Sequence, residues 1–330
     1  MKYLFTTVQG LEDVVVEELT TRFATTSAST TYMSGRVIAD VDASPQELLS
    51  LRSVERFGVF LASGRFSTLK DIVDGVKAVL PEIASYAAPF TTAGVACERV
   101  GEHGFTSRDV EAAVGALLKE MGATISLVDP DIELNVDVIG DSYYVWLTAA
   151  RTSLKDRPYR RYQHYASLNP VVAYAMARLA RPKDGETLCD LTCGGGTICI
   201  EASSLARIRC LCVDISLRHL KGAASNFEAA GVNADLLWFD STKLHRALRP
   251  ICDIFAFNPP YGVRIPADIH KLYRGLARAI ELLARPKARV VVITPRWRAF
   301  LRYFPGEVLE RRVIYQGGLY SSIVVGRIDK

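Results

Sequence analysis

The chain has 330 residues, of which 49% are hydrophobic and 23% are charged, and this globular composition excludes a disordered or collagen-like chain. No apolar stretch approaches the about 18 residues that a membrane span needs. The N-terminal sequence MKYLFTTVQGLED lacks the long apolar core of a signal peptide. We therefore expect a soluble, cytoplasmic protein without a membrane partner.

The net charge of +4 is distributed unevenly along the chain. Residues 1–150 carry 11 basic and 21 acidic side chains, a balance of −10, whereas residues 151–330 carry 29 basic and 15 acidic side chains, a balance of +14. The asymmetry indicates two regions, of which the basic one is the candidate for a polyanionic partner. The alternative is two solvated surfaces that differ by chance.

The first 150 residues alternate between short strands and helices with hairpin signals, which is typical of an α+β region. The predicted strands are Tyr3–Thr7, Val37–Val41, Val54–Ser63, Gly94–Arg99, Ile132–Ile139 and Tyr143–Ala149. The predicted helices are Leu11–Thr21, Pro45–Leu51, Leu69–Leu80 and Arg108–Met121. Ser107 or Thr106 is placed to cap the last of these helices.

The segment 151–166 breaks this pattern, and we expect a domain boundary there. Basic side chains alternate with tyrosines and a single acid in Arg151–Tyr162. A basic segment with aromatic residues can hold a phosphate backbone, and it can equally be a solvated linker.

The second half alternates apolar strands with helices, which predicts a parallel sheet covered on both faces. The predicted strands are Thr187–Leu191, Ile208–Asp214, Ala234–Asp240, Asp253–Asn258, Arg289–Thr294, Val308–Tyr315 and Leu319–Ile328. The predicted helices are Pro170–Leu179, Thr197–Leu205, Leu217–Ala230, Ala267–Leu283 and Trp297–Tyr303. Gly317-Gly318 joins the last two strands closely, so we expect the final strand to run antiparallel.

Neither the seven cysteines nor the histidines show the spacing of a metal site. There is no Cys-x-x-Cys, and four cysteines lie in apolar strand-like runs: Cys189, Cys210, Cys212 and Cys252. We expect reduced core thiols rather than disulfides or zinc ligands. We expect surface or turn positions for His103, His164, His245 and His270.

A glycine-rich turn, Asp190–Thr197, ends the first predicted strand of the second half and opens a helix. Glycine lets a ligand approach the backbone closely, and ligands of open α/β sheets bind at the carboxyl ends of the strands. Asp214 and Asp240 end the next two strands, where acids can bind ribose hydroxyls and an adenine edge. Cys199 stands where a dinucleotide fingerprint needs glycine, and no P-loop follows. S-adenosylmethionine is the adenosine compound that fits.

The sequence Asn258-Pro259-Pro260-Tyr261-Gly262 ends the fourth strand. Successive prolines cannot continue a sheet, so this turn presents a side-chain carbonyl, a backbone carbonyl and an aromatic face. The exocyclic amine of a nucleobase is a poor nucleophile until acceptors hold its protons, and two carbonyls can do so. The aromatic ring can stack on the base, at about 1–3 kcal/mol per base.

Asp190–Thr197, Asp214, Asp240 and Asn258–Tyr261 together resemble the class I adenosylmethionine-dependent methyltransferases that act on amino groups. The whole chain resembles the THUMP-containing tRNA and rRNA guanine-N2 methyltransferases, and most closely the enzymes that act on the sixth nucleotide of the tRNA acceptor stem. The further matching pieces are Thr6-Thr7, Gly10-Leu11-Glu12, Gly101–Ser107, Ser167-Leu168-Asn169-Pro170, Ile198–Ala202 and Arg264.

The resemblance implies a ferredoxin-like domain at 1–52, a THUMP domain at 53–150, a basic linker at 151–166 and a Rossmann-like methyltransferase domain at 167–330. The last domain is expected to have a seven-stranded, mostly parallel sheet with an antiparallel last strand.

The resemblance also implies the roles of individual residues. The catalytic residues are expected to be Asn258, Pro259 and Tyr261. S-adenosylmethionine is expected to contact Asn169, Asp190, Thr192, Gly194, Gly195, Gly196, Thr197, Asp214, Asp240 and Asn258. The N-terminal half is expected to bind the tRNA 3′ end, and the catalytic domain the acceptor stem. The expected RNA-binding residues are Arg99, Arg108, Lys119, Arg157, Arg160 and Arg161.

The Asn-Pro-Pro-Tyr sequence also occurs in adenine-N6 and glutamine methyltransferases, so the identity of the base rests on the N-terminal half. The alternatives to an acceptor-stem guanine-N2 enzyme are a guanine-N2 enzyme for another tRNA or rRNA site, an adenine-N6 enzyme, or a non-catalytic tRNA-binding protein.

Overall fold

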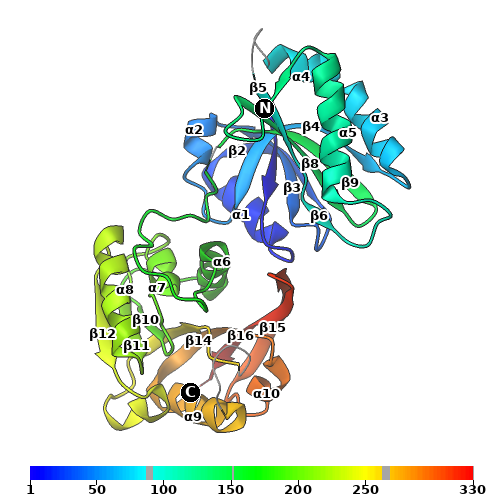
Figure 1. Cartoon of the computed structure of the whole chain (residues 1–330). Coiled ribbons are helices and arrows are strands. Elements are labelled where there is room, and N and C mark those ends of the chain that lie inside the picture. Colours follow the sequence, from blue (N-terminus) through cyan, green and yellow to red (C-terminus); the bar gives the residue numbers. More distant parts are fainter. Residues whose placement is uncertain (87–91, 151, 262–267, 330) are drawn as a thin grey trace. The chain divides into compact units, whose positions relative to one another are not determined.

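The chain folds into two units, each with its own sheet (Figure 1). The computed structural model describes residues 1–86, 92–150, 152–261 and 268–329; Arg151, Gly262, Arg264 and Ala267, named above, lie outside these residues. The N-terminal unit consists of Met1–Thr6 and Val15–Ser153, and the C-terminal unit of Thr7–Val14 and Leu154–Lys330. Within the described ranges, every helix is too short or too polar to cross a membrane.

The N-terminal unit is built on a nine-stranded mixed sheet, in the order β2-β3-β1-β4-β9-β8-β5-β7 with β6 beside β8. Its strands are β1 (Lys2–Thr6), β2 (Ala24–Thr30), β3 (Arg36–Asp42), β4 (Arg56–Arg65), β5 (Thr92–Ala96), β6 (Arg99–Val100), β7 (Thr124–Ile125), β8 (Ile132–Ile139) and β9 (Ser142–Thr148). Its helices are α1 (Glu12–Arg22), α2 (Pro45–Leu48), α3 (Leu69–Ala78), α4 (Leu80–Tyr86) and α5 (Ser107–Glu120). Because β1 pairs with both β3 and β4, strands from before and after residue 52 share one sheet.

Three helices of this unit, α2, α3 and α5, begin with capping boxes. Thr68 caps α3 with Asp71, and Thr106 caps α5 with Asp109, so that each hydroxyl and carboxylate satisfies backbone N–H groups of the first turn. The apolar faces of α3 and α5 pack against β8 and β9 in one core. Thr106 rather than Ser107 is the N-cap of α5. Strand β2 was not predicted, because its exposed sequence ATTSAST lacks an apolar alternation.

The C-terminal unit contains a seven-stranded sheet in the order β12-β11-β10-β13-β14-β16-β15. Its strands are β10 (Thr187–Asp190), β11 (Arg209–Asp214), β12 (Ala234–Trp238), β13 (Cys252–Phe257), β14 (Ala284–Thr294), β15 (Glu307–Gln316) and β16 (Leu319–Ile328). Its helices are α6 (Pro170–Ala180), α7 (Thr197–Ala202), α8 (Leu217–Ala230), α9 (Ile269–Leu283), α10 (Trp297–Leu301) and a 3-10 helix at Ser241–Arg246.

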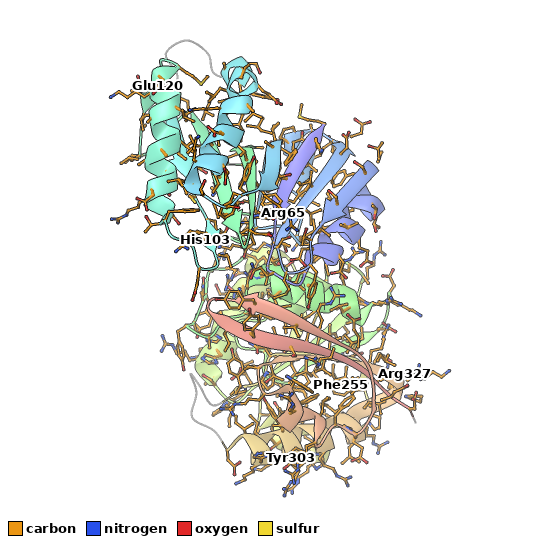
Figure 2. The ribbon with its side chains drawn as sticks, turned by 90° about the vertical axis from the view of Figure 1, so that its right-hand side faces the viewer. Arg65, His103, Glu120, Phe255, Tyr303 and Arg327 are labelled. Atoms are coloured by element: carbon orange, nitrogen blue, oxygen red, sulfur yellow. A yellow bond between two sulfur atoms is a disulfide. The ribbon has the colours of Figure 1, made fainter. Side chains whose placement is uncertain are left out.

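The pairings within this sheet confirm the predicted architecture. Strands β10 to β14 pair in parallel, whereas β16 pairs antiparallel with both β14 and β15. Successive strand residues enter opposite cores: Ile254 packs with α6, α7 and α8, and Phe255 (labelled in Figure 2) packs with α9 and α10. A sheet covered on both faces explains why its strands read as continuous apolar runs.

The segment Thr7–Val14 packs within the C-terminal unit, although it precedes most of the N-terminal sheet in sequence. Val8, Leu11 and Val14 are buried in the core that also holds α6. The backbone N–H of Tyr315 donates to the carbonyl of Gln9 over 3.1 Å. Burial of these three apolar side chains anchors the segment there.

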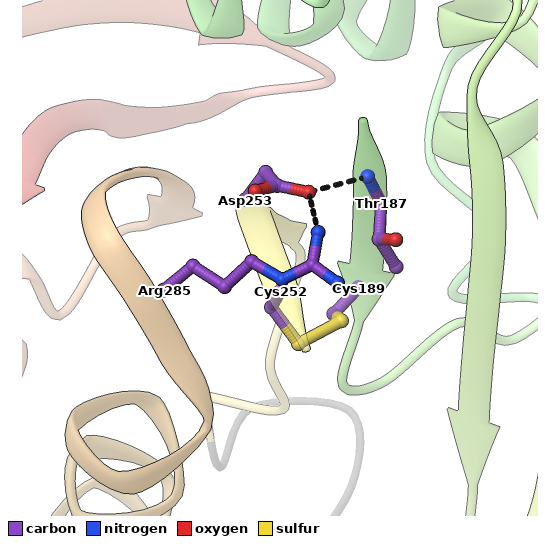
Figure 3. The surroundings of a disulfide bond; sticks show 5 residues. All are labelled: Thr187, Cys189, Cys252, Asp253 and Arg285. Carbon is purple, nitrogen blue, oxygen red and sulfur yellow. Dashed lines mark hydrogen bonds and ion pairs between the residues drawn. A yellow bond between two sulfur atoms is a disulfide. The ribbon is translucent and has the colours of Figure 1, made fainter. Parts of the chain in front are cut away.

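The structure corrects the expectation that all cysteines are reduced. Cys189 of β10 and Cys252 of β13 form a disulfide, with their Cα atoms 5.8 Å apart. Figure 3 shows that Asp253, beside Cys252, also joins the two strands: its Oδ2 accepts from the backbone N–H of Thr187 over 2.8 Å and from Arg285 over 2.9 Å. The pairing was not predictable, because β10 and β13 are distant in sequence and become neighbours in the sheet. The remaining five cysteines are free thiols.

Candidate active site

A cavity of about 440 Å³ lies at the carboxyl end of the parallel strands of the C-terminal unit. Its walls come from the loops after β10, β11, β12 and β13 and from residues 164–168. Strands β10 and β13 are neighbours, and the connection after β10 leads to β11 on one side whereas the connection after β13 leads to β14 on the other. Such a switch point opens the crevice in which ligands of this fold class bind.

The turn after β10 brings backbone rather than side chains to the cavity wall. Gly194 has a φ of +52° and Gly196 a φ of +78°, in the left-handed region that favours glycine. A Cβ on Gly194 would lie 2.8 Å from Nε2 of His164, and one on Gly196 would lie 2.5 Å from the ring of Phe227. Glycine is therefore required at both positions for conformation and for packing.

Asp190 and Thr192 add two polar groups to the cavity. Asp190 is 1% exposed, and burial, with a further contribution from the negative charge of Asp214, raises its pKa to about 8. The backbone N–H of Thr192 donates to Asp190 Oδ1 over 3.1 Å. The hydroxyl of Thr192 is buried without a hydrogen-bond partner in the described chain. A cationic ligand that also offers a hydrogen-bonding group fits this pair.

Asp214 connects the loop after β10 with the loop after β11. Its carboxylate accepts from the backbone N–H of Gly194 over 2.9 Å and from that of Ser216 over 2.8 Å. Nδ1 of His219 lies 3.5 Å from its Oδ1. A carboxylate offers about four lone-pair positions, so Asp214 can still accept hydrogen bonds from a ligand in the cavity that it lines.

Asp240 caps the 3-10 helix that follows β12. Its Oδ1 accepts from the backbone N–H of Thr242 over 3.1 Å and from the hydroxyl of Thr242 over 2.6 Å, and Nζ of Lys243 lies 3.0 Å from Oδ2. Burial acts to raise the pKa of Asp240, but the hydrogen bonds from Thr242 and Lys243 outweigh burial and lower it. The cavity therefore has an ionised acceptor at this strand end.

The residues after β13 complete the cavity. Asn258, Pro259 and Tyr261 line it directly after the strand ends at Phe257. The side-chain amide of Asn258 makes no hydrogen bond with any described residue. It can present its carbonyl oxygen to a donor in the cavity, next in sequence to the backbone carbonyl of Pro259.

Comparisons with known proteins agree with this geometry. A family model described as "RMKL-like, methyltransferase domain" matches residues 157–321, and a THUMP domain model matches residues 66–148. A tRNA (guanine(6)-N2)-methyltransferase from Archaeoglobus fulgidus is 30% identical over 98% of this chain and 92% of its own. The chain belongs to the tRNA guanine-N2 methyltransferase family. Another member, from Thermus thermophilus, is 32% identical over 97% of both chains, and the crystal structure of TrmN from that species matches 99% of both chains with a TM-score of 0.83 at 29% identity.

Most residues predicted to bind the cofactor of this methyltransferase line one cavity. They are Asp190, Thr192, Gly194, Gly195, Thr197, Asp214, Asp240 and Asn258, and the predicted catalytic residues Pro259 and Tyr261 join them. Gly196 and Asn169 do not line it. Gly196 is the N-cap of α7, and Asn169 caps α6 by accepting from the backbone N–H of Val171 over 2.9 Å.

Two histidines, His164 of the linker and His219 of α8, line the cavity unexpectedly. His164, expected at a surface or turn position, is half-buried and stacks on His219 with ring centroids 4.5 Å apart. Burial and the neighbouring His219 lower the pKa of His164. No local motif marks these residues, because 164 lies in the linker and 219 in α8. In the described parts of the chain, no group of three His, Cys, Asp or Glu could hold a metal ion.

The THUMP region has a second hollow, of about 980 Å³, at the beginnings of α3 and α5. His103, labelled in Figure 2 and also expected at a surface or turn position, packs between Phe66 and Phe105, with centroids 5.4 Å from each. Arg99 supports this loop, because its guanidinium donates to the carbonyl of Gly101 over 2.9 Å and lies 2.9 Å from Nδ1 of His103. The loop 101–107 is therefore ordered by its own aromatic cluster.

The expected RNA-binding residues differ in accessibility. Arg108, Lys119 and Arg161 are exposed and Arg160 is half-buried. Arg157 has only 8% of its side chain exposed, and its Nε lies 3.0 Å from a carboxylate oxygen of Glu201, so its guanidinium is paired within the domain. Lys119 lies near the far end of α5, about 16 Å along the helix axis from Arg108 at a rise of 1.5 Å per residue. It is therefore distant from the loop 101–107, which precedes Arg108.

Proposed function

We propose that this protein transfers a methyl group from S-adenosylmethionine to the exocyclic N2 amine of a guanosine at the sixth nucleotide of the tRNA acceptor stem, in the cytoplasm. The observation that carries the proposal is the Asn258 amide, which makes no hydrogen bond with any described residue and lies in a cavity that also holds Asp190, Asp214 and Asp240. One cavity thus brings amine acceptors and nucleotide-binding acids together.

The residues of the cavity fit the cofactor. Backbone at Gly194 and Gly195 leaves space for its methionine part, and the unpartnered Thr192 hydroxyl and the buried Asp190 offer partners for its ammonium group. Asp214 can accept from the ribose hydroxyls and Asp240 from the adenine amine. When bound, S-adenosylmethionine supplies an electrophilic methyl group on a positively charged sulfur.

The residues after β13 act on the target amine. Oδ1 of Asn258 and the carbonyl oxygen of Pro259 accept hydrogen bonds from its two N–H groups, which draws the nitrogen lone pair out of conjugation with the ring. These acceptors strengthen as positive charge develops on nitrogen, so they stabilise the transition state more than the ground state. Tyr261 stacks on the base and offsets part of the few kcal/mol that flipping a paired nucleotide costs.

We further propose that the THUMP region holds the 3′ end of the tRNA. The hollow between α3 and α5 is lined by Phe66, His103 and Phe105, and aromatic rings of this kind can stack with unpaired bases. The exposed Arg108 at the start of α5 adds a cation beside it.

The test is Asn258→Ala, assayed by mass spectrometry of nucleosides from tRNA that lacks the modification. We expect turnover to fall by more than tenfold while calorimetry shows cofactor affinity within a few fold of the wild type. Asn233→Ala, at an exposed position, is the control and should keep full activity. If Asn258→Ala keeps more than about a tenth of turnover, a loss under about 1.4 kcal/mol, the role of Asn258 is wrong. N6-methyladenosine as the product would overturn the choice of base.

A further inference from the structure

A second, smaller cavity adjoins the first at Asn258. It has a volume of about 170 Å³ and shares residues 166–168, Asn258 and Tyr261 with the larger cavity. Its other wall is formed by the hairpin of β15 and β16, drawn in red tones in Figure 1, and by Ile293 of β14. It is smaller than the roughly 300–1,000 Å³ of a drug-sized ligand site, which suits one planar ring system.

The register of the hairpin determines which side chains face this cavity. Ile314 pairs with Ser321 and Gln316 pairs with Leu319 across the antiparallel strands. Side chains of paired residues lie on one face, and residues two apart along a strand share that face. All four of these residues line the cavity.

The intervening residues belong to the other face of the hairpin. Tyr315 and Tyr320 pair there, with ring centroids 4.7 Å apart, and Tyr320 is 63% exposed. A one-residue change of register would exchange the two faces, but the bridge from the backbone of Tyr315 to Gln9 holds the strand in place.

Gln316 is the residue of this wall with both a hydrogen-bond donor and an acceptor on one planar group. It is half-buried, and its side-chain amide makes no hydrogen bond with any described residue. An amide that has no partner among the described residues and lies in a cavity beside Asn258 is positioned for a ligand.

We propose that Gln316 reads the edge of the target base and selects guanine, an inference that rests on the proposed function. On guanine, the N2 amine is followed along the same edge by the N1–H donor and the O6 acceptor. A primary amide matches this order, because its carbonyl accepts from N1–H while its NH2 group donates to O6. Adenine has an acceptor at N1 and no O6, so it forms at most one of these hydrogen bonds. Gln316 thereby supplies the distinction that the Asn-Pro-Pro-Tyr turn does not make.

The experiment compares two tRNA substrates that carry either guanosine or 2-aminopurine riboside at the methylated position. 2-Aminopurine keeps the amine on C2 but lacks both O6 and the N1 proton. We expect the wild-type enzyme to prefer guanosine by roughly 10- to 100-fold in kcat/KM, the range of a good bidentate contact to a base. Gln316→Met, of similar length but without these groups, should reduce the preference to within about threefold.

Two further variants make the outcome decisive. Tyr320→Leu, on the outer face of the same hairpin, should keep the wild-type preference. Gln316→Glu, which retains the acceptor for N1–H but has no donor for O6, should keep only part of it, and unchanged cofactor affinity by calorimetry shows that each variant is folded. A wild type without preference, or a Gln316→Met variant that keeps it, overturns the role of Gln316 and leaves the proposed function intact. A wild type that methylates neither tRNA refutes the proposed function and, with it, this inference.

Discussion

Asp190 is a buried carboxyl group whose surroundings oppose its ionisation. Burial raises its pKa to about 8 in the folded protein, whereas an aspartate in an unfolded chain has a pKa of about 3.9. Between these values the folded protein keeps a proton that the unfolded chain has released. The free energy of unfolding therefore decreases as the pH rises from about 4 to about 8.

Asp190→Asn should remove this decrease in the free energy of unfolding, because the amide is neutral at every pH and its oxygen can still accept a hydrogen bond from the N–H of Thr192. Without cofactor at pH 8, we expect the variant to melt at least about 2–4 °C above the wild type, the shift that 1 kcal/mol gives in a domain of 150–250 residues. The difference should vanish near pH 4. Melting curves across this range test it, with the exposed Asp156→Asn as control; a constant difference at all pH values would contradict it.

At the scale of elements, the linker after residue 156 is held on α8 by a few specific contacts. The backbone N–H of Tyr162 donates to Oδ1 of Asn226 over 2.8 Å, and Nδ2 of Asn226 donates to the carbonyls of Tyr162 and Gly195, each over 2.9 Å. The ring of Tyr162 lies directly over Gly222, where a Cβ would approach to 2.2 Å. These contacts place His164 at the cavity.

Gly222→Ala should therefore destabilise the protein, although alanine favours helices by about 1 kcal/mol. Overpacking of this kind costs typically about 1–3 kcal/mol, and displacement of the linker should also weaken cofactor binding. Gly115→Ala in α5 is the matched control, because its Cβ would meet no atom within 4 Å and should stabilise by about 0.5–1 kcal/mol. Thermal unfolding distinguishes the two substitutions. Equal stabilisation by both would show that the Tyr162 ring moves away from the new Cβ without lowering the free energy of unfolding.

At the scale of the whole molecule, the balance of −10 over residues 1–150 and +14 over residues 151–330 assigns the two halves different parts in RNA binding. Because a broadly acidic half repels a phosphate backbone, we propose that its contact with tRNA is local, at the loop 101–107 and Arg108. In this proposal, long-range attraction comes from the basic half, including Arg160 and Arg161.

Neutralising Arg160 and Arg161 to glutamine should weaken binding to any RNA duplex. It should also reduce the dependence of log K on log salt by up to about 2, at roughly 0.9 per phosphate contact. Arg108→Gln should instead reduce the preference for tRNA with an intact 3′ end. Titrations at several salt concentrations with intact and 3′-trimmed tRNA separate the effects. Equal methylation of trimmed and intact tRNA would show that the THUMP region does not position the substrate by its 3′ end.

Local sequence was sufficient where the chemistry lies at the end of a strand. The apolar runs before Asp190, Asp214 and Asn258 mark buried strands, and the glycines or prolines after Asp190 and Asn258 mark the turns that leave the sheet. Because the carboxyl ends of parallel strands meet at one edge, these residues could be assigned to one site without knowledge of the strand order. The alternation of apolar runs with helices also predicted the seven strands, and the Gly317-Gly318 turn predicted the antiparallel last strand.

Tertiary structure alone decided the features that depend on which segments become neighbours. Cys189 and Cys252 pair because β13 lies beside β10, and His164 meets His219 because the linker packs on α8. Gln316 faces the smaller cavity because of the register of a hairpin that follows the whole catalytic sequence. A local sequence pattern indicates which residues of a strand or helix are buried. Contacts between distant segments arise only when the complete sheet and its helices pack together.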